Sequence, residues 1–503
     1  MTNTIALNAN PLVRSIGKLS KDFTKADIIK YVEDNGIMMV DFHYIAGDRR
    51  LKTLNFVIND REYLDRILTL GERVDGSSLF GFMEAGKSDI YVLPRFSTAF
   101  LNPFKEEPTI SFLCSYFHKS GEFLHNSAEY TLRKAIKSFE DATKGMEFWA
   151  MGELEYYVIS QKEELFNAKD QKGYHESTPF AKFEMFRTEA MKLIAQCGGQ
   201  IKYGHSEVGN FSLEGTYYEQ NEIEFLPVPV LEAADQILLA KWILRTLAHE
   251  RYGYNITFAP KITIGKAGSG MHIHTQIIKN GKNLYVKDGE LSTEAKRTIA
   301  GFMLLAASIT AFGNTNPTSY LRLVPNQEAP TTVCWGDRNR STLVRVPLGW
   351  RTTLNMCHKA NPLEPNTPGK FSDQQSIEFR ASDGTSNIYL LLAALVIAAR
   401  EGFEMPEKEA IKMADDTYVL GNIHKDNTEV ATHHLVSLPA SCAESAECLE
   451  RMRAVYEKYD VFSKDLINAT IAKLRSYNDA NLRSELEKDP VKMAEIVETY
   501  FHC

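Results

Sequence analysis

The 503-residue sequence lacks the marks of several classes of protein. Its seven cysteines are scattered along the chain, odd in number and never spaced as CxxC, which favours free thiols in a reducing compartment over a disulfide framework. The first residues contain no apolar core of the kind that a signal peptide carries. We therefore expect a cytoplasmic setting.

Basic clusters and long apolar runs are also absent. No block of Lys and Arg with interleaved aromatic residues is present, and the net charge is −8, from 57 basic and 65 acidic residues. This balance speaks against a nucleic acid or a membrane surface as a partner. The longest apolar run, 388–399, is shorter than a membrane span requires, so it predicts a buried helix.

Familiar nucleotide-binding fingerprints are missing as well. The segment Gly268-Ser-Gly270 has neither the lysine-bearing phosphate-loop pattern nor the dinucleotide pattern, so neither of those two folds is indicated. Hydrophobic residues make up 44% of the chain and charged residues 24%, as in ordinary globular proteins. The length predicts two or three domains.

The chain divides into a small first domain, residues 1–120, and a large second domain, residues 121–503. The first twenty residues are predicted to be loosely ordered, and the rest of the first domain alternates like a set of strands with one early helix. The second domain mixes strands with long helices, so the expected fold class is α+β. Expected elements there are helices over 128–140, 179–197, 233–251, 295–312 and 388–402, and strands around 153–155, 201, 222–225 and 255–262.

Two glutamates in an apolar run are the first candidates for chemistry. Glu153 and Glu155 stand two apart in a segment rich in aromatic and β-branched residues, which predicts a buried strand with both carboxylates on one face. Like charges are costly to bury side by side. Such a pair is explained either by bound cations or by a strand face that is exposed to water.

Further candidate ligands occur in similar strand-like segments, and together they favour the cation. Carboxylate oxygens with a minority of imidazole nitrogens suit Mg²⁺ or Mn²⁺ and not a soft metal. Any single glutamate of this kind is more often a surface residue, whereas a set of them can share two cations. The set comprises Glu153, Glu155, Glu207, Glu222, Glu378 and His272.

Five arginines are concentrated in one third of the chain. Guanidinium groups bind carboxylates and phosphates through two parallel hydrogen bonds, although a single arginine can equally pair with the acidic excess at the surface. Divalent ions together with several arginines are what phosphoryl transfer requires. These arginines are Arg322, Arg338, Arg340, Arg345 and Arg380.

With these segments in view, the chain resembles glutamine synthetase from about residue 20 to its C-terminal end, and its spacing is similar to that of the shorter prokaryotic-type enzymes. The resemblance implies an N-terminal β-grasp domain followed by a large catalytic α+β domain. It also implies a homo-oligomer, a dodecamer of two stacked hexameric rings, in which the first domain of one subunit completes the active site of its neighbour. The motifs that carry it are Asp75-Gly-Ser-Ser78, Glu153-x-Glu155, Phe258-Ala-Pro-Lys261, Gly268-Ser-Gly-Met-His272, Arg322-Leu-Val-Pro-x-x-Glu328-Ala-Pro330, Arg338-Asn-Arg-Ser341 and Glu378-Phe-Arg380.

The resemblance assigns roles to individual residues. Two or three Mg²⁺ or Mn²⁺ ions per active site are implied, one of them on the acceptor side and another on the phosphates of ATP. The implied ligands are Glu155, Glu207 and Glu222 for the first ion and Glu153, His272 and Glu378 for the second.

The remaining roles concern the substrates. Arg322 and Arg380 would bind glutamate beside Gly268, Arg340 and Arg345 would meet the transferred phosphate, and His274 would lie near ATP. Glu328 would shield the intermediate and take a proton from bound ammonium. The ammonium pocket would be completed by Tyr174 and by Asp75 and Ser78 of the adjacent subunit.

The implied reaction joins ammonia to the γ-carboxylate of L-glutamate at the expense of ATP. Phosphorylation turns this poor electrophile into an acyl phosphate with a good leaving group, and deprotonated ammonium then attacks it. Exclusion of water protects the acyl phosphate.

Several positions depart from the family pattern. Ala267 replaces an asparagine that contacts glutamate, Ser376 replaces an arginine near the nucleotide, and Lys202 replaces a glutamate near ATP. Val436 replaces the tyrosine that some bacterial members adenylylate, so we expect no adenylylation there. The segment between Glu207 and Glu222 is longer than usual, which makes Glu219 and Glu224 competitors for the Glu222 ligand position.

Two alternative functions follow from these departures. A γ-glutamyl-amide ligase would use an organic amine instead of ammonia and is expected to have a less intact ammonium pocket, yet the pocket residues match. A catalytically silent scaffold is expected to have lost metal ligands, yet all six positions carry a candidate.

Overall fold

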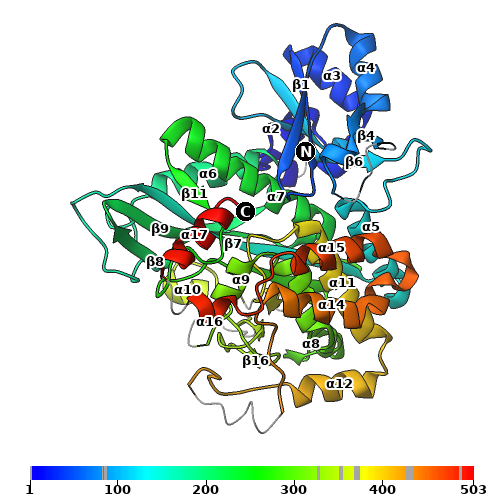
Figure 1. Ribbon diagram of the computed structural model, residues 1–503. Helices are drawn as coiled ribbons and strands as arrows, with labels where there is room; N and C mark the ends of the chain where they lie inside the picture. Colours follow the sequence, from blue (N-terminus) through cyan, green and yellow to red (C-terminus); the bar gives the residue numbers. More distant parts are fainter. Residues whose placement is uncertain are drawn as a thin grey trace.

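The computed structural model describes residues 3–81, 83, 86, 88–325, 329–349, 355–367, 374–425, 434–486 and 490–503. Two sheets and a set of long helices make up the fold, with the N-terminal domain at the top of Figure 1 and the larger domain below it. The predicted α+β class is confirmed.

The N-terminal domain is built on a six-stranded sheet with strand order β2-β1-β6-β4-β3, to which β5 is added beside β6. The pair β1 and β6 is parallel, and the other pairs are antiparallel. Helices α3 and α4 pack on the sheet, and their apolar residues share one core with it. The bounds are α3 Lys25–Asn35, β1 Met39–Ile45, β2 Leu51–Val57, α4 Arg61–Leu70, β3 Glu72–Asp75, β4 Asp89–Pro94, β5 Phe100–Leu101 and β6 Thr109–Phe117.

The predicted loose order of the first twenty residues is wrong. They contain the short helices α1 (Asn3–Ala6) and α2 (Pro11–Ile16). Asn10 caps α2 and donates a side-chain hydrogen bond to the carbonyl of Ala99 at 3.1 Å, while Leu12 and Val13 are fully buried. Helices of this length show too little periodicity to be recognised in a sequence, and tertiary packing stabilises them.

A second sheet, of ten strands in the described residues, forms the centre of the larger domain. Its main order is β16-β17-β18-β12-β7-β9-β8, with β10 and β11 beside β7 and β13 beside β12. β14 and β15 form a separate hairpin. The bounds are β7 Glu147–Gln161, β8 Ile201–Leu213, β9 Thr216–Phe225, β10 Val228–Pro229, β11 Asn255–Thr257, β12 Met271–Lys279, β13 Lys282–Asn283, β14 Val286–Lys287, β15 Glu290–Leu291, β16 Trp335–Asp337, β17 Val344–Val346 and β18 Ile377–Phe379.

Five long helices contribute to the main core of this domain: α5 (Ala128–Thr143), α7 (Val230–Leu247), α8 (Thr293–Gly313), α11 (Ile388–Glu404) and α14 (Cys442–Glu457). Gly301 allows α8 and α11 to approach closely, because a Cβ at this position would collide with the carbonyl of Ala398. Within the described part of the chain, α8 is the one helix whose length and composition would allow it to cross a membrane, and 78% of its most apolar window is buried in the protein.

Smaller helices complete the domain, and two boundaries differ from the prediction. The helix expected over 179–197 begins five residues later, as α6 (Glu184–Gln196), and the strand expected over 255–262 ends early, at Thr257. The other α-helices are α9 Pro317–Arg322, α10 Met356–Ala360, α12 Glu407–Asp416, α15 Lys464–Arg475, α16 Leu482–Leu486 and α17 Pro490–Tyr500.

The segment between Glu207 and Glu222 forms the hairpin of β8 and β9, which turns at Glu214 and Gly215. Phe211 stacks on Tyr218 with ring centroids 4.6 Å apart, and both belong to an apolar cluster with residues of α16 and α17. The C-terminal helices accordingly lie against this hairpin in Figure 1, in red.

Candidate active site

One face of the second sheet collects the predicted carboxylates and imidazoles. Side chains two apart on a strand share a face, so Glu153 and Glu155 of β7 point the same way, as do His272 and His274 of β12. The strand register then brings the neighbours together: Glu153 lies opposite His272 and Glu224, Glu155 opposite Glu222, Glu222 opposite His205, and Glu378 opposite His274 and Arg345.

Glu153 is the centre of the first group of ligand atoms. Its two carboxylate oxygens contact His272 Nδ1 at 2.9 Å and His274 Nε2 at 2.8 Å. Burial acts to raise the pKa of Glu153, but the two rings hold this pKa well below its usual value. Atoms of Glu153, His274 and Glu378 lie close enough to hold one metal ion.

Glu378 connects this group to the arginines. Its carboxylate accepts hydrogen bonds from Arg345 at 2.8 Å and from Arg380 Nε at 3.0 Å, and its side chain is 2% exposed. Burial and Glu153 act to raise the pKa of Glu378, while Arg380 and the histidines lower it, with a net decrease. A ligand of one candidate ion is thereby held in place by two guanidinium groups.

The second group consists of His205, Glu207 and Glu222. His205 Nε2 lies 3.6 Å from Glu222, and His205 Nδ1 lies 3.9 Å from Glu207. Burial, together with the charges of Glu153, Glu155, Glu207 and Glu224, raises the pKa of Glu222 well above its usual value. This carboxylate lacks the compensation that Glu153 obtains from the histidines.

Glu155 stands between the two groups. Its carboxylate accepts hydrogen bonds from the Gly270 amide at 2.8 Å and from the Gln220 side chain at 2.9 Å, and it lies 3.9 Å from His272 Nε2. The distances thus place both His272 and His274 beside Glu153 and Glu378, at 3.6 and 4.0 Å from Glu378, and they add His205 to Glu207 and Glu222. The assignment of the six predicted ligands to particular ions stays a prediction.

His205 is a candidate ligand that the sequence reasoning missed. Its signal was present, because His205 and Glu207 are two apart on a predicted strand, as Glu153 and Glu155 are. Glu219, a predicted competitor of Glu222, points to the other side of β9, where it accepts hydrogen bonds from the amides of Lys182 and Phe183 near the start of α6.

The donor set fits divalent ions of the Mg²⁺ or Mn²⁺ type. The atoms are carboxylate oxygens with a minority of imidazole nitrogens, they come from five neighbouring strands, and their side chains are mostly buried. Several like charges buried this closely need a cation. The residues present therefore match the group of ions that the sequence predicts.

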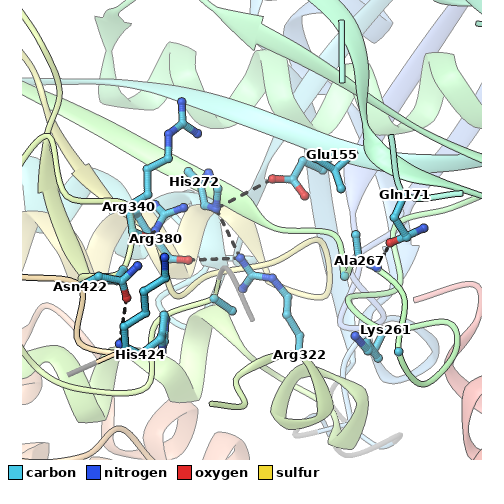
Figure 2. Close-up of a pocket in the computed structure, with 16 residues that line it drawn as sticks. Glu155, Gln171, Lys261, Ala267, His272, Arg322, Arg340, Arg380, Asn422 and His424 are labelled. Atoms are coloured by element: carbon cyan, nitrogen blue, oxygen red, sulfur yellow. Dashed lines mark hydrogen bonds and ion pairs between the residues drawn. The ribbon is translucent and has the colours of Figure 1, made fainter. Parts of the chain in front are cut away.

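Three of the five predicted arginines, Arg322, Arg340 and Arg380, line a cavity of about 550 Å³ beside the carboxylates (Figure 2). Arg322, at the end of α9, extends toward His272 Nε2 at 3.3 Å and toward the carbonyl of Arg380 at 3.3 Å. Gly268 and Gly270 permit this approach, because a Cβ on Gly268 would lie 3.1 Å from Arg322 Cγ and a Cβ on Gly270 would collide with its guanidinium.

A second cavity, of about 270 Å³, contains the carboxylates and adjoins the first. The second cavity is also lined by Arg345, His274 and Tyr174. Such a lining suits a polyanion with its bound cations at one end of the cavity and the molecule that accepts the transferred group at the other. The residues common to both cavities are Glu155, Val208, Ala267, Gly268, His272, Arg340 and Arg380.

Asp75 and Ser78 of the same chain lie elsewhere. They occupy an exposed turn of the N-terminal domain, where Asp75 accepts the Ser78 hydroxyl at 2.8 Å. Hydrogen bonds from Ser88, Ser77 and Ser78 hold the pKa of Asp75 below its usual range. Among the described residues, the linings of the two cavities do not include them. Glu328 lies outside the described residues.

The structure shows the local contacts of the positions that are expected from the sequence to depart from the family pattern. The amide of Ala267 donates to Gln171 Oε1 at 2.7 Å, and its carbonyl accepts from the Tyr157 hydroxyl at 2.8 Å, so the Gly268 loop is held through its backbone. The Ser376 hydroxyl lies 2.8 Å from His274 Nδ1. Val436 is 63% exposed, and the absence of adenylylation there stays a prediction.

Lys261 was not predicted as a site residue, yet it lines the larger cavity. Burial, with a contribution from Arg322, lowers the pKa of Lys261 to about 8. The signal was its place in the Phe258–Lys261 motif, where a lysine follows an apolar run. A cation in this position adds to the anion-binding character of the cavity.

Comparison with known proteins gives two family matches. Residues 36–119 match the model of the glutamine synthetase β-grasp domain, and residues 127–493 match that of the glutamine synthetase catalytic domain. Similar proteins include glutamine synthetases of Microchaete diplosiphon (29% identical, covering 88% of this chain and 93% of that protein) and Frankia alni (28%, covering 88% and 94%). A 3-hydroxylaminophenol mutase of Cupriavidus pinatubonensis is 27% identical, with 89% and 94% covered.

Solved structures share the fold. A Plasmodium falciparum glutamine synthetase superposes with a TM-score of 0.73 at 19% identity, covering 92% of this chain and 97% of that one. A structure described as GmaS without ligand superposes with a TM-score of 0.70 at 18% identity, covering 90% and 97%. With both domain models matched in order over most of its length, the chain belongs to the glutamine synthetase family and has that family's N-terminal β-grasp domain.

Proposed function

We propose that this protein joins ammonia to the γ-carboxylate of L-glutamate with ATP, by way of γ-glutamyl phosphate, and releases L-glutamine, ADP and phosphate. The observation that carries the proposal is the contiguity of two cavities: one contains the buried carboxylates and imidazoles, the other is lined by arginines, and seven residues line both. The first suits cations that accompany ATP, and the second suits an acidic substrate.

Divalent ions, Mg²⁺ or Mn²⁺, would be held by Glu153, Glu378 and a histidine of β12 on one side and by Glu207, Glu222 and Glu155 on the other. When bound, they neutralise the charge of the phosphates during transfer. The buried oxygens and imidazoles fit this role, because within the described residues the negative charges of this face exceed the positive charges that contact them.

The arginines would position the reacting groups. Arg322 and Arg380 bind the glutamate beside Gly268, and Arg340 and Arg345 meet the transferred phosphate, with His274 near the nucleotide. The γ-carboxylate oxygen attacks the terminal phosphorus of ATP, and the bond between that phosphorus and the bridging oxygen breaks to release ADP. Arg345 and Arg380 are both held by Glu378, so they would act from fixed positions.

The second step is the attack of ammonia on the acyl carbon, with departure of phosphate. Glu328 would take the proton that makes ammonium nucleophilic and would shield the intermediate from water. Tyr174 lines the acceptor side of the smaller cavity. Asp75 and Ser78 would complete the ammonium pocket of a neighbouring subunit, which is supported by their exposed position outside the linings of the two candidate-site cavities of their own chain.

An organic amine is the second candidate acceptor. The observation in its favour is the Tyr174 ring, which is 48% exposed in the chain and so leaves the acceptor side open. We assign the reaction to the cytoplasm, since none of the seven cysteines, all in the described residues, forms a disulfide.

The test is phosphate release from ATP by the purified full chain with Mg²⁺ and L-glutamate, comparing ammonium with a panel of primary amines. Saturable release with ammonium that is lost in Glu328→Ala and Glu153→Gln supports the proposal. Glu219→Gln is the matched control, because Glu219 lies on the same sheet, is more buried than Glu153 and faces α6. Release with amines alone identifies an amide ligase, and ATP binding without release identifies a scaffold.

A further inference from the structure

A third set of carboxylates on the same face is not explained by the two candidate ions. Oxygen atoms of Glu153, Glu222 and Glu224 lie within 4.8 Å of one another, and Glu224 stands directly opposite Glu153 across β7 and β9. This group of three contains no histidine, and Glu153 and Glu222 are each already part of another group. Three like charges this close repel strongly unless a cation is near.

Lys202 supplies such a cation. Its ammonium Nζ lies 2.5 Å from Glu224 Oε2, and the other oxygen of Glu224 accepts the hydroxyl of Tyr203. Lys202 Nζ also lies 5.0 Å from the centre of the Tyr203 ring, within reach of a cation–π interaction. Both residues line the cavity that contains the carboxylates.

The backbone explains how two consecutive residues reach one carboxylate. Neighbours on a regular strand point to opposite faces, so Lys202 and Tyr203 are not expected to share Glu224. The pairing of β8 with β9 has a register shift at this point: Ile201 pairs with Phe225 and Tyr203 with Glu224, which leaves Lys202 as the extra residue of a β-bulge. Bulges redirect side chains, often beside active sites.

The burial of the pair separates it from an ordinary surface ion pair. The Glu224 side chain is 7% exposed and that of Lys202 32%. Lys296 of α8 is exposed to a similar extent, 30%, but its partner Asp415 is 56% exposed and faces solvent. Only the first pair joins a lysine to a buried group of like charges.

We propose that Lys202 is a tethered cation that occupies the third carboxylate group in place of a divalent ion. It leaves Glu153 and Glu222 available to the two ions of the active site. The inference rests on the proposed binding of divalent ions at this face, but not on which acceptor the enzyme uses.

Removal of the ammonium creates a measurable change. In Lys202→Met the three carboxylates lose their built-in cation, and the site left behind is formed by oxygen donors alone, as Mn²⁺ and Mg²⁺ prefer. We therefore expect this variant to bind one more Mn²⁺ per chain than the natural protein. Lys202→Arg keeps the charge and is expected to bind the natural number.

The experiment counts bound Mn²⁺ per chain by equilibrium dialysis of the full chain without nucleotide, with free Mn²⁺ read by electron paramagnetic resonance. Lys296→Met is the matched control, because it removes an equally exposed lysine from an acidic partner far from the sheet face. The double variant Lys202→Met/Glu224→Gln should return to the natural number, since the third group then has two carboxylates. Lys202→Gln repeats the test, and thermal melts verify that each variant is folded.

The outcomes separate the inference from the function on which it rests. An additional Mn²⁺ in Lys202→Met and Lys202→Gln that disappears in the double variant supports the tethered cation. If the natural protein binds Mn²⁺ and both variants bind the same number with the same affinity, the inference is wrong. If the natural protein binds none, the proposed metal-dependent function fails first, and the inference fails with it.

Discussion

Two groups of buried charges in this protein differ in their balance. The first joins the N-terminal domain to the helices of the second domain: Arg95 donates to Asp235 at 2.7 and 2.8 Å, and the Tyr389 hydroxyl donates to the same carboxylate at 2.6 Å. Glu129, next to it, is paired with Arg133. The second group is the carboxylate face of the ten-stranded sheet, where six glutamates line one cavity and Arg345, Arg380 and Lys202 of that lining form ion pairs with them.

The difference indicates which group holds the fold and which binds a ligand. A buried charge that is paired within the chain needs nothing from outside, and breaking such a pair leaves an uncompensated charge. A buried excess of one sign is unfavourable in the empty protein and becomes favourable when cations bind. The Arg95 network is therefore assigned to structure and the carboxylate face to function.

The largest expected effect comes from breaking the balanced group. Asp235→Asn leaves Arg95 buried without its main counter-charge, and we expect a loss of about 3–5 kcal/mol in the free energy of unfolding. Urea unfolding measures this loss, which should be the same with and without Mn²⁺. Asp415→Asn, which breaks the exposed pair with Lys296, should cost under about 1 kcal/mol. Equal losses in the two variants would contradict the assignment.

Glu222→Gln acts in the opposite direction in the metal-free protein. It removes one of several buried like charges, so the free energy of unfolding in EDTA should rise by about 1–3 kcal/mol. With saturating Mn²⁺ the order reverses, because a ligand has been lost. The measurement is urea unfolding in each condition, with Glu219→Gln as control, and a variant that is less stable in EDTA would refute the like-charge account.

The stabilisation by Mn²⁺ should increase with pH. Burial and neighbouring carboxylates raise the pKa of Glu222 above its usual 4.5. Burial acts to lower the pKa of His274, but the carboxylate of Glu153 outweighs it and raises this pKa above 6.5. Both groups favour the metal-free fold at low pH, and this contribution is lost as pH rises through their raised pKa values. Because Mn²⁺ displaces their protons, the gain in unfolding free energy at fixed Mn²⁺ should grow from pH 6 to pH 8, by up to about 1.4 kcal/mol per pH unit for each proton released.

Thermal or urea unfolding at each pH, with Mn²⁺ and with EDTA, gives this gain as a difference. Lys241 and Lys261, whose buried ammonium groups have pKa values lowered to about 7 and about 8, contribute equally to both conditions and cancel. A gain that stays constant or decreases with pH would mean that Glu222 and His274 do not release protons to the metal.

The smallest expected effect is that of Ser376→Ala. This change removes one hydrogen bond to His274 Nδ1. We expect it to weaken the binding of ATP by about 1 kcal/mol or less, which raises KM by up to about fivefold and leaves kcat nearly unchanged. Steady-state kinetics with ATP varied tests it. Ser160→Ala, at the far end of β7, is the control and should leave both constants unchanged. A large fall in kcat would give Ser376 a role in the reaction itself.

The sequence predicted the parts of this account that depend on strand periodicity and motif order. The shared face of Glu153 and Glu155, the candidate ligand His272 and the arginine-rich third of the chain all follow from spacing. It could not predict that Lys202 and Tyr203 reach the same carboxylate, because a β-bulge inverts the alternation by one residue. The sequence also could not show which of His272 and His274 shares a metal ion with Glu153, since both histidines lie on one face of β12 and both contact Glu153.

Tertiary packing explains the other features that the sequence did not predict. The N-terminal helix α2 is too short to show periodicity, but its Leu12 and Val13 side chains are fully buried in the core of the first domain. From the sequence, the segment between Glu207 and Glu222 affects the choice of ligand, whereas in the structure its Phe211 and Tyr218 rings pack against the C-terminal helices. In both cases distant contacts decide the structure, and local sequence does not contain them.

The most direct test of the central claim follows nitrogen into the product. The full chain is incubated with ATP, L-glutamate and ¹⁵N-ammonium, with Mg²⁺ or with EDTA, and the product is analysed by mass spectrometry beside the phosphate released. We predict one ¹⁵N in the side-chain amide of L-glutamine for each phosphate released when Mg²⁺ is present, and no incorporation in EDTA. Phosphate release without incorporation of ¹⁵N, or incorporation that persists in EDTA, would contradict a metal-dependent ammonia ligase.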